Sequence, residues 1–558
     1  MPSILERIGA RLAIVHATRV YRKFRRALDD VQQSQNEALR RALVRVRGGD
    51  WAKRHRLHNV RSIDDMRTAV PIQTYEDLRP TIERVAAGDI HALFSRDVDV
   101  LMFATSSGTM SQPKWIPVTK AFVDDYRRGW NTFGVKVLAD HPAAILRPIL
   151  QSTGRMDAER SASGLPVGAI TGLLAQTQKS IVRRFYVGGP EIAAIDDPAM
   201  RQYALMRMAI ERDVAFAITA NPATLIELAK CVNRRAEVMI RDVRDGTLSH
   251  VSDGGSLALR RAKPLKPNPG LATRLEALLE AHGALRPRDY WSMTFLACWT
   301  GGSMGQYLNR LSDWYGPIPV RDIGLLASEG RVSIPVADGS AAGPLDIATS
   351  LFEFIPVESA HAANPPTLRP QELEVGTEAI VVLTNTAGLV RYRLDDVVRV
   401  TGRIGATPMV EFLHRAGGVS SIAGEKLTEQ QVVAAVRAAC SALQIPEFDY
   451  LLCPMWGDPP CYRLSVEFSA SEALLEALDR ALGAQNEEYE SRRKTLRLNR
   501  LESQSWPAGA ISALDAMLRR ERGATAEQYK RTSLLLSPGA DDAMFARISQ
   551  DRPNSPPT

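Results

Sequence analysis

Apolar and polar residues repeat along the chain with two different periods, which predict helices in some segments and strands in others. From Ile4 to about Val46, apolar residues recur at roughly helical spacing with basic residues between them, and this predicts an N-terminal helical layer. A further helix is expected to start at Thr74, within V-P-I-Q-T-Y-E-D-L. The apolar run V-D-V-L-M-F-A-T at 98–105 predicts a buried strand, and a helix is expected from Ala121.

The middle of the chain alternates apolar strands with amphipathic helices, which is the rhythm of an α/β fold. V-A-F-A-I-T-A at 214–220 predicts a strand, and the following A-T-L-I-E-L-A-K-C-V predicts a helix. K-P-L-K-P-N-P-G at 263–270 is a proline-rich connector. The strand-rich stretches E-A-I-V-V-L-T-N and L-V-R-Y-R-L-D-D-V-V-R-V predict a β subdomain attached to the main sheets.

The composition becomes small and flexible at A-G-G-V-S-S-I-A-G, residues 416–424, and the pattern changes beyond it. We therefore expect a large domain over residues 1–418, a small domain over 419–548 and a disordered tail over 549–558. The small domain is predicted to be an α+β unit of ordinary domain size. Its expected elements are, in order, a helix at 428–442, strands at 448–454 and 461–468, a helix at 471–487, a strand near 496–502 and a helix at 508–521.

The composition and charge are those of an ordinary globular protein, with 45% apolar residues, 24% charged residues and a formal charge of +7 over 558 residues. The 70 basic residues are spread along the chain and nearly balanced by 63 acidic ones, so a nucleic-acid partner is not expected and stays the most remote alternative. The sequence contains neither an apolar stretch long enough for a membrane span nor a secretory leader. We therefore expect neither a membrane-spanning nor a secreted protein. Five cysteines without C-x-x-C spacing suggest reduced, mostly buried thiols in a cytoplasmic protein.

The segment T-S-S-G-T-M-S-Q-P-K at 105–114 follows the predicted strand with hydroxyls and a glycine and ends on Lys114. Backbone N–H groups and hydroxyls in such a loop can surround phosphate oxygens, while the lysine supplies a positive charge. The same composition fits a solvated surface turn, so this stretch by itself leaves both interpretations open. The sequence lacks the Walker pattern G-x-x-x-x-G-K-[ST], which disfavours an ordinary P-loop nucleotide hydrolase.

Three later stretches supply groups that a nucleotide and its metal ion require. T-G-G-S-M at 300–304 is a second loop that follows an apolar strand. A-S-E-G places Glu329 among small residues, and this suits Mg²⁺, which takes one or two carboxylates together with phosphate oxygens. Y-R-L-D-D-V-V ends a strand with Asp395 and Asp396, one of which could accept from both ribose hydroxyls. Glu329 could instead be a solvated loop acid, and Asp395 and Asp396 could form a hairpin turn. The order in which these stretches follow one another along the chain argues against both alternatives.

That order resembles the adenylate-forming superfamily, whose signature begins T-S-G-T-T-G-x-P-K, and within it the GH3 acyl acid amido synthetases, including the bacterial members. The supporting stretches run along nearly the whole chain: V-P-I-Q-T-Y-E-D-L-R-P, S-S-G-T-M-S-Q-P-K-W-I-P-V-T, S-G-L-P-V-G-A-I-T-G, T-G-G-S-M-G-Q-Y-L, A-S-E-G, F-E-F-I-P, A-G-L-V-R-Y-R-L-D-D-V-V, E-K-L-T-E and A-E-Q-Y-K. The resemblance implies an α/β fold. A large adenylate-forming N-terminal domain would hold β-sheets, flanking helices and a β subdomain, and a small α+β C-terminal domain would be mobile.

The resemblance also implies a ligase that uses ATP and Mg²⁺ in two steps. A small carboxylic acid attacks the α-phosphorus of ATP to give an acyl-adenylate and pyrophosphate, and an amino acid amine then attacks the activated carbonyl and releases AMP. The first step requires charge neutralisation more than covalent chemistry by the protein. We expect a monomer with these two small-molecule substrates, and no residue in the sequence identifies the acid or the amine.

Carried over position by position, the resemblance assigns most of a nucleotide site. Lys114 would be the cation of the phosphate loop. The residues expected to bind the phosphates, or to border the adenine and the α-phosphate, are Ser106, Ser107, Gly108, Thr109, Thr300, Gly301, Ser303, Met304 and Ser328.

The remaining assignments concern the metal, the ribose and the hinge between the domains. Glu329 would bind Mg²⁺, Asp396 the ribose, and Arg415 the phosphate or ribose near the hinge. Phe352 is a candidate wall for adenine, with a buried strand aromatic as the alternative. Lys426 beside the hinge and Lys530 in the small domain would join Lys114 as catalytic cations, and rotation of the small domain is expected to exchange these two lysines between the half-reactions.

Four positions depart from the family pattern. Met110 and Ser111 stand where the loop usually has Thr or Ser followed by Gly, and Leu325 replaces a Tyr found in many members. Asp395 replaces the usual Gly before the ribose aspartate. The loss of Gly at position 111 would matter if the backbone there needed positive φ, which serine adopts at a cost. A catalytically weakened small-molecule-binding homologue therefore stays open as an alternative, as does an acyl-CoA synthetase-like thioester ligase, which shares the first step.

Overall fold

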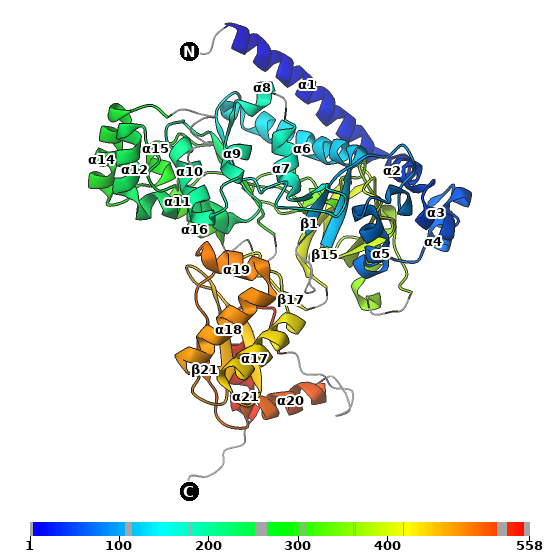
Figure 1. The fold of residues 1–558 in the computed structure, drawn as a ribbon. Coiled ribbons are helices and arrows are strands. Elements are labelled where there is room, and N and C mark those ends of the chain that lie inside the picture. Colours follow the sequence, from blue (N-terminus) through cyan, green and yellow to red (C-terminus); the bar gives the residue numbers. More distant parts are fainter. Residues whose placement is uncertain are drawn as a thin grey trace. The chain divides into compact units, whose positions relative to one another are not determined.

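The structure, a computed structural model, divides the chain into two compact units (Figure 1). The large unit contains the described residues up to Ala416, and the small unit contains those after it. The residues that the structure describes are 4–106, 114–178, 180–251, 265–301, 304, 307–360, 362, 364–416, 418–521 and 533–551. No helix within these residues is long and apolar enough to cross a membrane.

The large unit begins with the predicted helical layer. Two long helices, α1 (Ile4–Asp29) and α2 (Val31–Val46), are separated by Asp30, whose carboxylate accepts from Gln33 N at 3.0 Å and starts α2. The predicted start at Thr74 is confirmed, because Thr74 and Asp77 form a capping box at the beginning of α5. The helices that follow α2 are α3 (Asp50–Arg54), α4 (Ile63–Ala69) and α5 (Tyr75–Ala86).

A four-stranded sheet with the order β2-β1-β5-β4 comes next. The predicted strand is confirmed as β1, but the sequence analysis did not predict the antiparallel strand β2 that pairs with it. Thr119, the last residue of β2, caps α6 by accepting from Phe122 N at 3.1 Å, so strand and helix are directly joined. The elements are β1 (Val100–Ser106), β2 (Lys114–Thr119), β4 (Glu159–Arg160), β5 (Pro166–Gly168) and α6 (Lys120–Asp140).

A five-stranded parallel sheet, in the order β6-β3-β7-β8-β9, confirms the predicted α/β rhythm. Its strands are β3 (Ile149–Gln151), β6 (Tyr186–Val187), β7 (Phe216–Ile218), β8 (Phe295–Cys298) and β9 (Val320–Asp322). Figure 1 shows the green helices of this region gathered together. The helices between and after these strands are α7 (Ile170–Gln176), α8 (Ser180–Arg183), α9 (Pro190–Ala193), α10 (Pro198–Ala209), α11 (Pro222–Arg234), α12 (Ala236–Asp245), α14 (Pro269–His282), α15 (Pro287–Tyr290) and α16 (Leu308–Tyr315).

The predicted β subdomain is an antiparallel sheet in the order β12-β16-β15-β14-β13. Gln35 of α2 is buried against it: its amide donates to the carbonyls of Ile347 and Ser350, and its oxygen accepts from Phe352 N at 2.8 Å. The N-terminal layer is therefore bound to this sheet through a fully satisfied polar side chain. The strands are β12 (Gly343–Pro344), β13 (Leu351–Pro356), β14 (Glu378–Thr384), β15 (Tyr392–Ile404) and β16 (Thr407–Arg415), and the short hairpin β10 (Leu326–Ala327) and β11 (Gly330–Arg331) precedes them.

The small unit has its own apolar core beneath a three-stranded sheet, β19-β20-β21, and it follows the predicted α+β order. Strand β21 lies later in the chain than predicted, and helices α19 and α21 were not predicted from the sequence. All five cysteines of the chain are buried and free, as expected. The elements are β17 (Val419–Ser420), β18 (Leu427–Thr428), α17 (Glu429–Leu443), β19 (Tyr450–Met455), β20 (Cys461–Val466), α18 (Glu472–Gln485), α19 (Glu487–Lys494), β21 (Glu502–Ser505), α20 (Ala510–Glu521) and α21 (Ala540–Asp551).

Candidate functional site

The predicted phosphate segment connects two neighbouring antiparallel strands. Ser106 at the end of β1 and Lys114 at the start of β2 are register partners, so the connection leaves and re-enters the sheet at adjacent positions. The positions between them lie outside the described residues. They include three of the four predicted phosphate ligands of this loop, Ser107, Gly108 and Thr109, and the two irregular positions, Met110 and Ser111. The strands thus fix both ends of this segment.

Lys114 is a buried cation at the mouth of this hairpin. Its Nζ lies 5.8 Å from the centre of the Tyr75 ring, and the Tyr75 hydroxyl accepts from Trp115 N at 2.8 Å. Burial, together with the positive charge of Arg415, lowers the pKa of Lys114 against the attraction of Glu329, Asp395 and Asp396. Sequence reasoning missed Tyr75, which is far from Lys114 along the chain.

Glu329 lies at the tip of the β10–β11 hairpin and is almost completely buried, with 2% of its surface exposed. Its carbonyl accepts from Asn385 Nδ2 at 2.7 Å, which holds the hairpin against the end of β14. Ser328 Oγ donates to the carbonyl of Thr105 at 2.8 Å. The predicted metal ligand Glu329 is therefore held close to β1, the strand that precedes the phosphate segment, by the hydrogen bond of its neighbour Ser328.

Asp396 and Arg415 occupy facing positions on β15 and β16. Arg415 Nε lies 3.2 Å from Asp396 Oδ1, and Arg415 Nη2 donates to the carbonyl of Leu394 at 2.8 Å. Burial acts to lower the pKa of Arg415, but the negative charges of Asp396, Glu329 and Asp395 raise it overall. The arginine is held as a permanent cation beside the predicted ribose ligand.

Asp395 has a left-handed backbone, with φ of +63°. This conformation favours glycine, and Asp is one of the few other residues that tolerate it. Arg393 Nε donates to Asp395 Oδ1 at 2.6 Å, and Ala416 N donates to its carbonyl at 2.7 Å. The departure from the family glycine at this position therefore has a physical account: the backbone needs positive φ, and local hydrogen bonds hold an aspartate in it.

These side chains form one charged cluster within the large unit. Lys114 and Arg415 both interact electrostatically with Glu329, Asp395 and Asp396, although the strands that carry them come from different sheets. Two cations beside buried carboxylates are the groups that a metal-bound polyphosphate and a ribose would require. The structure thus brings together the predicted phosphate cation, metal ligand, ribose ligand and hinge arginine.

The T-G-G loop follows β8 and is anchored by a residue that the sequence analysis did not single out. Asp322 of β9, 3% exposed, accepts from Thr300 N at 2.6 Å and from Thr300 Oγ1 at 2.7 Å, while its other oxygen accepts from Gly324 N at 2.6 Å. Burial raises the pKa of Asp322 against these hydrogen bonds. Met304 N donates to the Gly301 carbonyl at 3.2 Å, and Ser303 lies outside the described residues.

Gly301 allows a close approach of the loop to the β subdomain. A Cβ atom at this position would lie 3.2 Å from Ala341 Cβ and 3.4 Å from the carbonyl of Phe412. A side chain here would press on Ala341, which would have to shift by a few tenths of an ångström, while the contact with Phe412 would be an ordinary one.

Phe352 lies in the hydrophobic core of the large unit, and none of its surface is exposed. Its ring stacks against Phe354 with the centroids 6.4 Å apart. This is the buried strand aromatic that the sequence left as the alternative, and its ring presents no surface to adenine.

The small unit carries the other two predicted catalytic lysines. Lys426 is half-buried, precedes β18 and has a left-handed backbone with φ of +49°. Lys530 lies outside the described residues.

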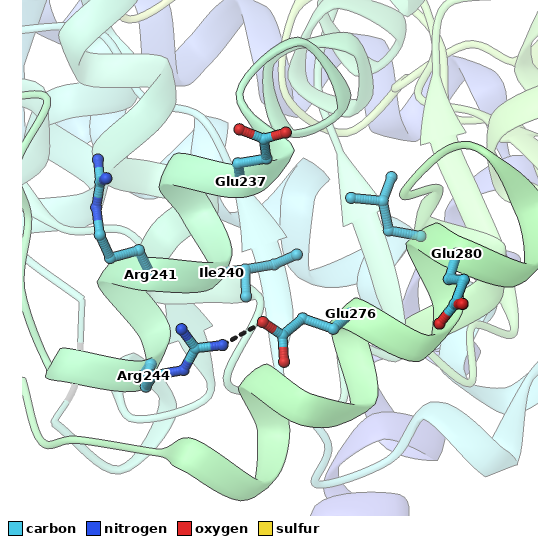
Figure 2. Close-up of a pocket in the computed structure, with 7 residues that line it drawn as sticks. Glu237, Ile240, Arg241, Arg244, Glu276 and Glu280 are labelled. Atoms are coloured by element: carbon cyan, nitrogen blue, oxygen red, sulfur yellow. Dashed lines mark hydrogen bonds and ion pairs between the residues drawn. The ribbon is translucent and has the colours of Figure 1, made fainter.

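A separate surface pocket of about 430 Å³ lies between α12 and α14 (Figure 2). An ion pair between Arg244 and Glu276 crosses it. Its lining contains none of the predicted site residues and consists of Glu237, Ile240, Arg241, Arg244, Glu276, Leu279 and Glu280. Within the described part of the chain, no group of three or more His, Cys, Asp or Glu side chains is arranged to hold a metal ion.

Comparison with known proteins gives consistent matches along the chain. Residues 20–320 match the GH3 family N-terminal domain, residues 344–415 the GH3 family central domain, and residues 430–538 the GH3 family C-terminal domain. A jasmonoyl-L-amino acid synthetase, JAR6 of Nicotiana attenuata, is 26% identical over 447 residues, which are 76% of each chain. The indole-3-acetic acid-amido synthetase GH3.5 of Arabidopsis thaliana is 24% identical over 74% of this chain and 72% of its own.

Among solved structures, the GH3.15 acyl acid amido synthetase superposes with a TM-score of 0.65 at 20% identity, over 95% of both chains. A second structure of that protein, in complex with 2,4-DB, gives a TM-score of 0.64. These likenesses confirm the fold class predicted from the sequence.

Proposed function

The chain belongs to the GH3 family, and we propose that it is an ATP-dependent ligase that joins a small carboxylic acid to the amine of an amino acid. The observation that carries this proposal is the match to all three GH3 domains in their order along the chain. The names of curated relatives support it, because they describe amido synthetases that act on jasmonoyl and indole-3-acetic acid groups. The charged cluster around Lys114 and Glu329 supports the use of ATP in particular.

The residues of this cluster fit a nucleotide with a magnesium ion. Glu329 supplies a buried carboxylate for Mg²⁺, and Lys114 and Arg415 supply positive charge for the phosphates. A site with few protein carboxylates suits Mg²⁺, which takes its remaining ligands from phosphate and water. When bound, the ion would neutralise charge on the phosphate oxygens.

In the first half-reaction, a carboxylate oxygen of the acid attacks the α-phosphorus and the bond to pyrophosphate breaks. Lys114 offsets the negative charge that builds up on the phosphate oxygens, and Asp396 orients the nucleotide by accepting from the ribose hydroxyls. Arg415 lies beside Asp396 and holds it in place. The hydroxyl of Thr300 is already engaged by Asp322, so the T-G-G loop would present mainly its backbone to the nucleotide.

In the second half-reaction, the amine nitrogen attacks the activated carbonyl, the C–O bond to AMP breaks, and the amine loses a proton to solvent or a base. We expect the small domain to bring Lys426 and Lys530 to the site in turn, one for each half-reaction. Phe352 has no part in this proposal, because the core encloses its ring.

A pyrophosphate-release screen over carboxylic acids and amino acids tests the proposal. The expected result is pyrophosphate release that depends on the acid and AMP formation that depends on the matching amino acid. Lys114→Ala should slow release by roughly 100-fold or more, and Lys53→Ala, at an exposed lysine paired with Asp50, should leave it unchanged. Transfer to coenzyme A in place of an amine would identify a thioester ligase. Binding of acid and nucleotide with no pyrophosphate release for any acid would identify a weakened binding homologue.

A further inference from the structure

We propose that Glu425 is a positioning residue for catalysis: its buried carboxylate fixes the loop that ends at Lys426 and thereby sets the direction of the lysine side chain. The inference rests on the proposed function, because it takes Lys426 as one of the cations of the ligase. It adds a residue to which neither the sequence analysis nor the family comparison gave a role.

The Glu425 carboxylate holds the loop of the β17–β18 hairpin by accepting hydrogen bonds from its backbone. The hairpin pairs Val419 with Thr428 and Ser420 with Leu427, which leaves residues 421–426 as its loop. Glu425 Oε1 accepts from Ile422 N at 2.7 Å, and Glu425 Oε2 accepts from Ala423 N at 2.7 Å. Each carboxylate oxygen thus fixes a different backbone amide of the loop.

Two residues from other elements hold this carboxylate and the backbone beside it. The Tyr462 hydroxyl, on β20, donates to Glu425 Oε1 and lies 2.9 Å from Ser420 Oγ. Asn486, at the start of α19, donates from Nδ2 to the Glu425 carbonyl at 2.9 Å and approaches the Lys426 carbonyl at 3.4 Å. Glu425 is therefore held through its side chain and its main chain at once.

Lys426 is the residue that this arrangement positions. Its φ of +49° belongs to the left-handed region, which a lysine adopts only when its surroundings impose it. The hydrogen bonds to the Glu425 side chain and carbonyl act on the residue immediately before this strained position. They supply the constraint, and the capping box of α17, formed by Thr428 and Gln431, fixes the chain just beyond it.

The chemistry of the site requires a carboxylate at position 425 and not merely a polar group of that size. Both oxygens accept from N–H donors while one also accepts from a phenol, and the side chain has no exposed surface. A glutamine would turn an NH₂ group toward one of these donors, which leaves a buried clash of two donors. Glu425→Gln is therefore a nearly isosteric change that releases one side of the loop.

The test is a double-mutant cycle on both half-reactions, with pyrophosphate exchange for the first and conversion of pre-formed acyl-adenylate to amide for the second. The inference predicts that Glu425→Gln and Tyr462→Phe slow, by roughly ten- to hundredfold, the half-reaction that Lys426→Ala slows. In the Lys426→Ala background, Glu425→Gln should have no further effect, because it acts through the lysine.

Glu467 provides the matched control. It also accepts from two backbone amides of the small unit, from Gly509 N at 2.9 Å and Ile511 N at 2.7 Å, but it caps α20. Glu467→Gln should lower the melting temperature and leave both half-reactions unchanged. Additive losses from Glu425→Gln and Lys426→Ala, or an active wild type that Lys426→Ala does not impair, would overturn the inference alone. Absence of both half-reactions in the wild type would instead contradict the proposed function and remove the basis of the inference.

Discussion

Arg415 and Asp396 face each other across β15 and β16, with Arg415 Nε 3.2 Å from Asp396 Oδ1, and both side chains are mostly buried. The pair places a fixed cation beside the carboxylate proposed to bind ribose, close enough to Glu329 for the three charges to interact. The same ion pair therefore contributes to the stability of the β subdomain and to the geometry of the proposed nucleotide site.

Removing both members of this pair is expected to destabilise the protein by less than the sum of the two single removals. Asp396→Asn or Arg415→Met takes away the charge that compensates the other, which for a buried pair costs about 3–5 kcal/mol in free energy of unfolding. Denaturant unfolding of the two single variants and the double variant measures this, and the double variant should lose less than the sum of the singles. Arg40→Met, in the exposed pair with Glu37, should change little, and additive losses at 396 and 415 would contradict the coupling.

Lys114 is expected to give the first half-reaction an alkaline limit. Because burial lowers its pKa, Lys114 loses its proton, and with it the positive charge, at a lower pH than an ordinary lysine near 10.4. The kcat/KM of pyrophosphate exchange, which reports the free enzyme, should therefore fall as the pH rises through this lowered pKa.

Substitution distinguishes Lys114 from other titrating groups. Lys114→Ala should lower kcat/KM by roughly 100-fold or more at neutral pH, since a single oriented cation or donor contributes that much. Lys114→Arg keeps its charge to much higher pH and should remove the alkaline limit while retaining part of the activity. If the limit persisted in the arginine variant, another group would be responsible.

Asp395 is expected to tolerate glycine and asparagine but not a β-branched residue. Its φ of +63° suits glycine, and the bond from Arg393 offsets the strain in the native aspartate, so Asp395→Gly and Asp395→Asn should stay within about 1 kcal/mol of the wild type. Asp395→Val should cost about 1–2 kcal/mol more. Chemical unfolding compares the three, and equal stability of the valine and glycine variants would contradict the backbone argument.

Asp346 is expected to make the large unit less stable as the pH rises from about 4 to about 6. Burial raises the pKa of Asp346 from 3.8 to about 6, against the attraction of Arg331. The folded state therefore binds this proton more tightly than the unfolded state, and its stabilising effect is lost once the pH passes the folded pKa. Melting temperatures of wild type and Asp346→Asn should diverge in favour of the variant between pH 4 and 7, whereas a constant difference would contradict the shift.

Much of the fold followed from patterns that are local in the sequence. The helical layer, the start of α5 at Thr74 and the order of elements in the small unit depend on periodicity and capping, which each segment carries by itself. Strand β2 was not predicted because Pro117 stands in the middle of its short apolar run, and its pairing with β1 is a tertiary property. Helix α19 follows α18 after a single residue and was not predicted, because the expected helix ended at 487 and the strongly charged sequence of α19 has no apolar periodicity.

The site could be predicted only where its chemistry lies in short motifs. Glu329 and Asp396 stand in such motifs, and the structure places both in one charged cluster with Lys114 and Arg415. The residues that hold this cluster in place do not stand in short motifs. Asp322 supports Thr300 from another strand, Ser328 reaches Thr105 across 223 positions, and the φ of Asp395 depends on the path of β15. The role of Phe352 could not be decided from the sequence, because an apolar strand pattern does not show whether an aromatic ring faces the core or a ligand. In the structure the ring lies in the core.

This GH3-family chain is proposed to couple ATP cleavage to amide formation. The most direct measurement incubates the full chain with Mg²⁺, ATP, an acid and an amino acid chosen from the pyrophosphate screen, and follows AMP and conjugate together by mass spectrometry. One amide is expected for each AMP released, with the rates of both lowered by roughly 100-fold or more in Lys114→Ala and unchanged in Lys53→Ala. Release of AMP without formation of the amide would contradict the proposed coupling. So would hydrolysis of ATP to AMP at a rate that Lys114→Ala does not change.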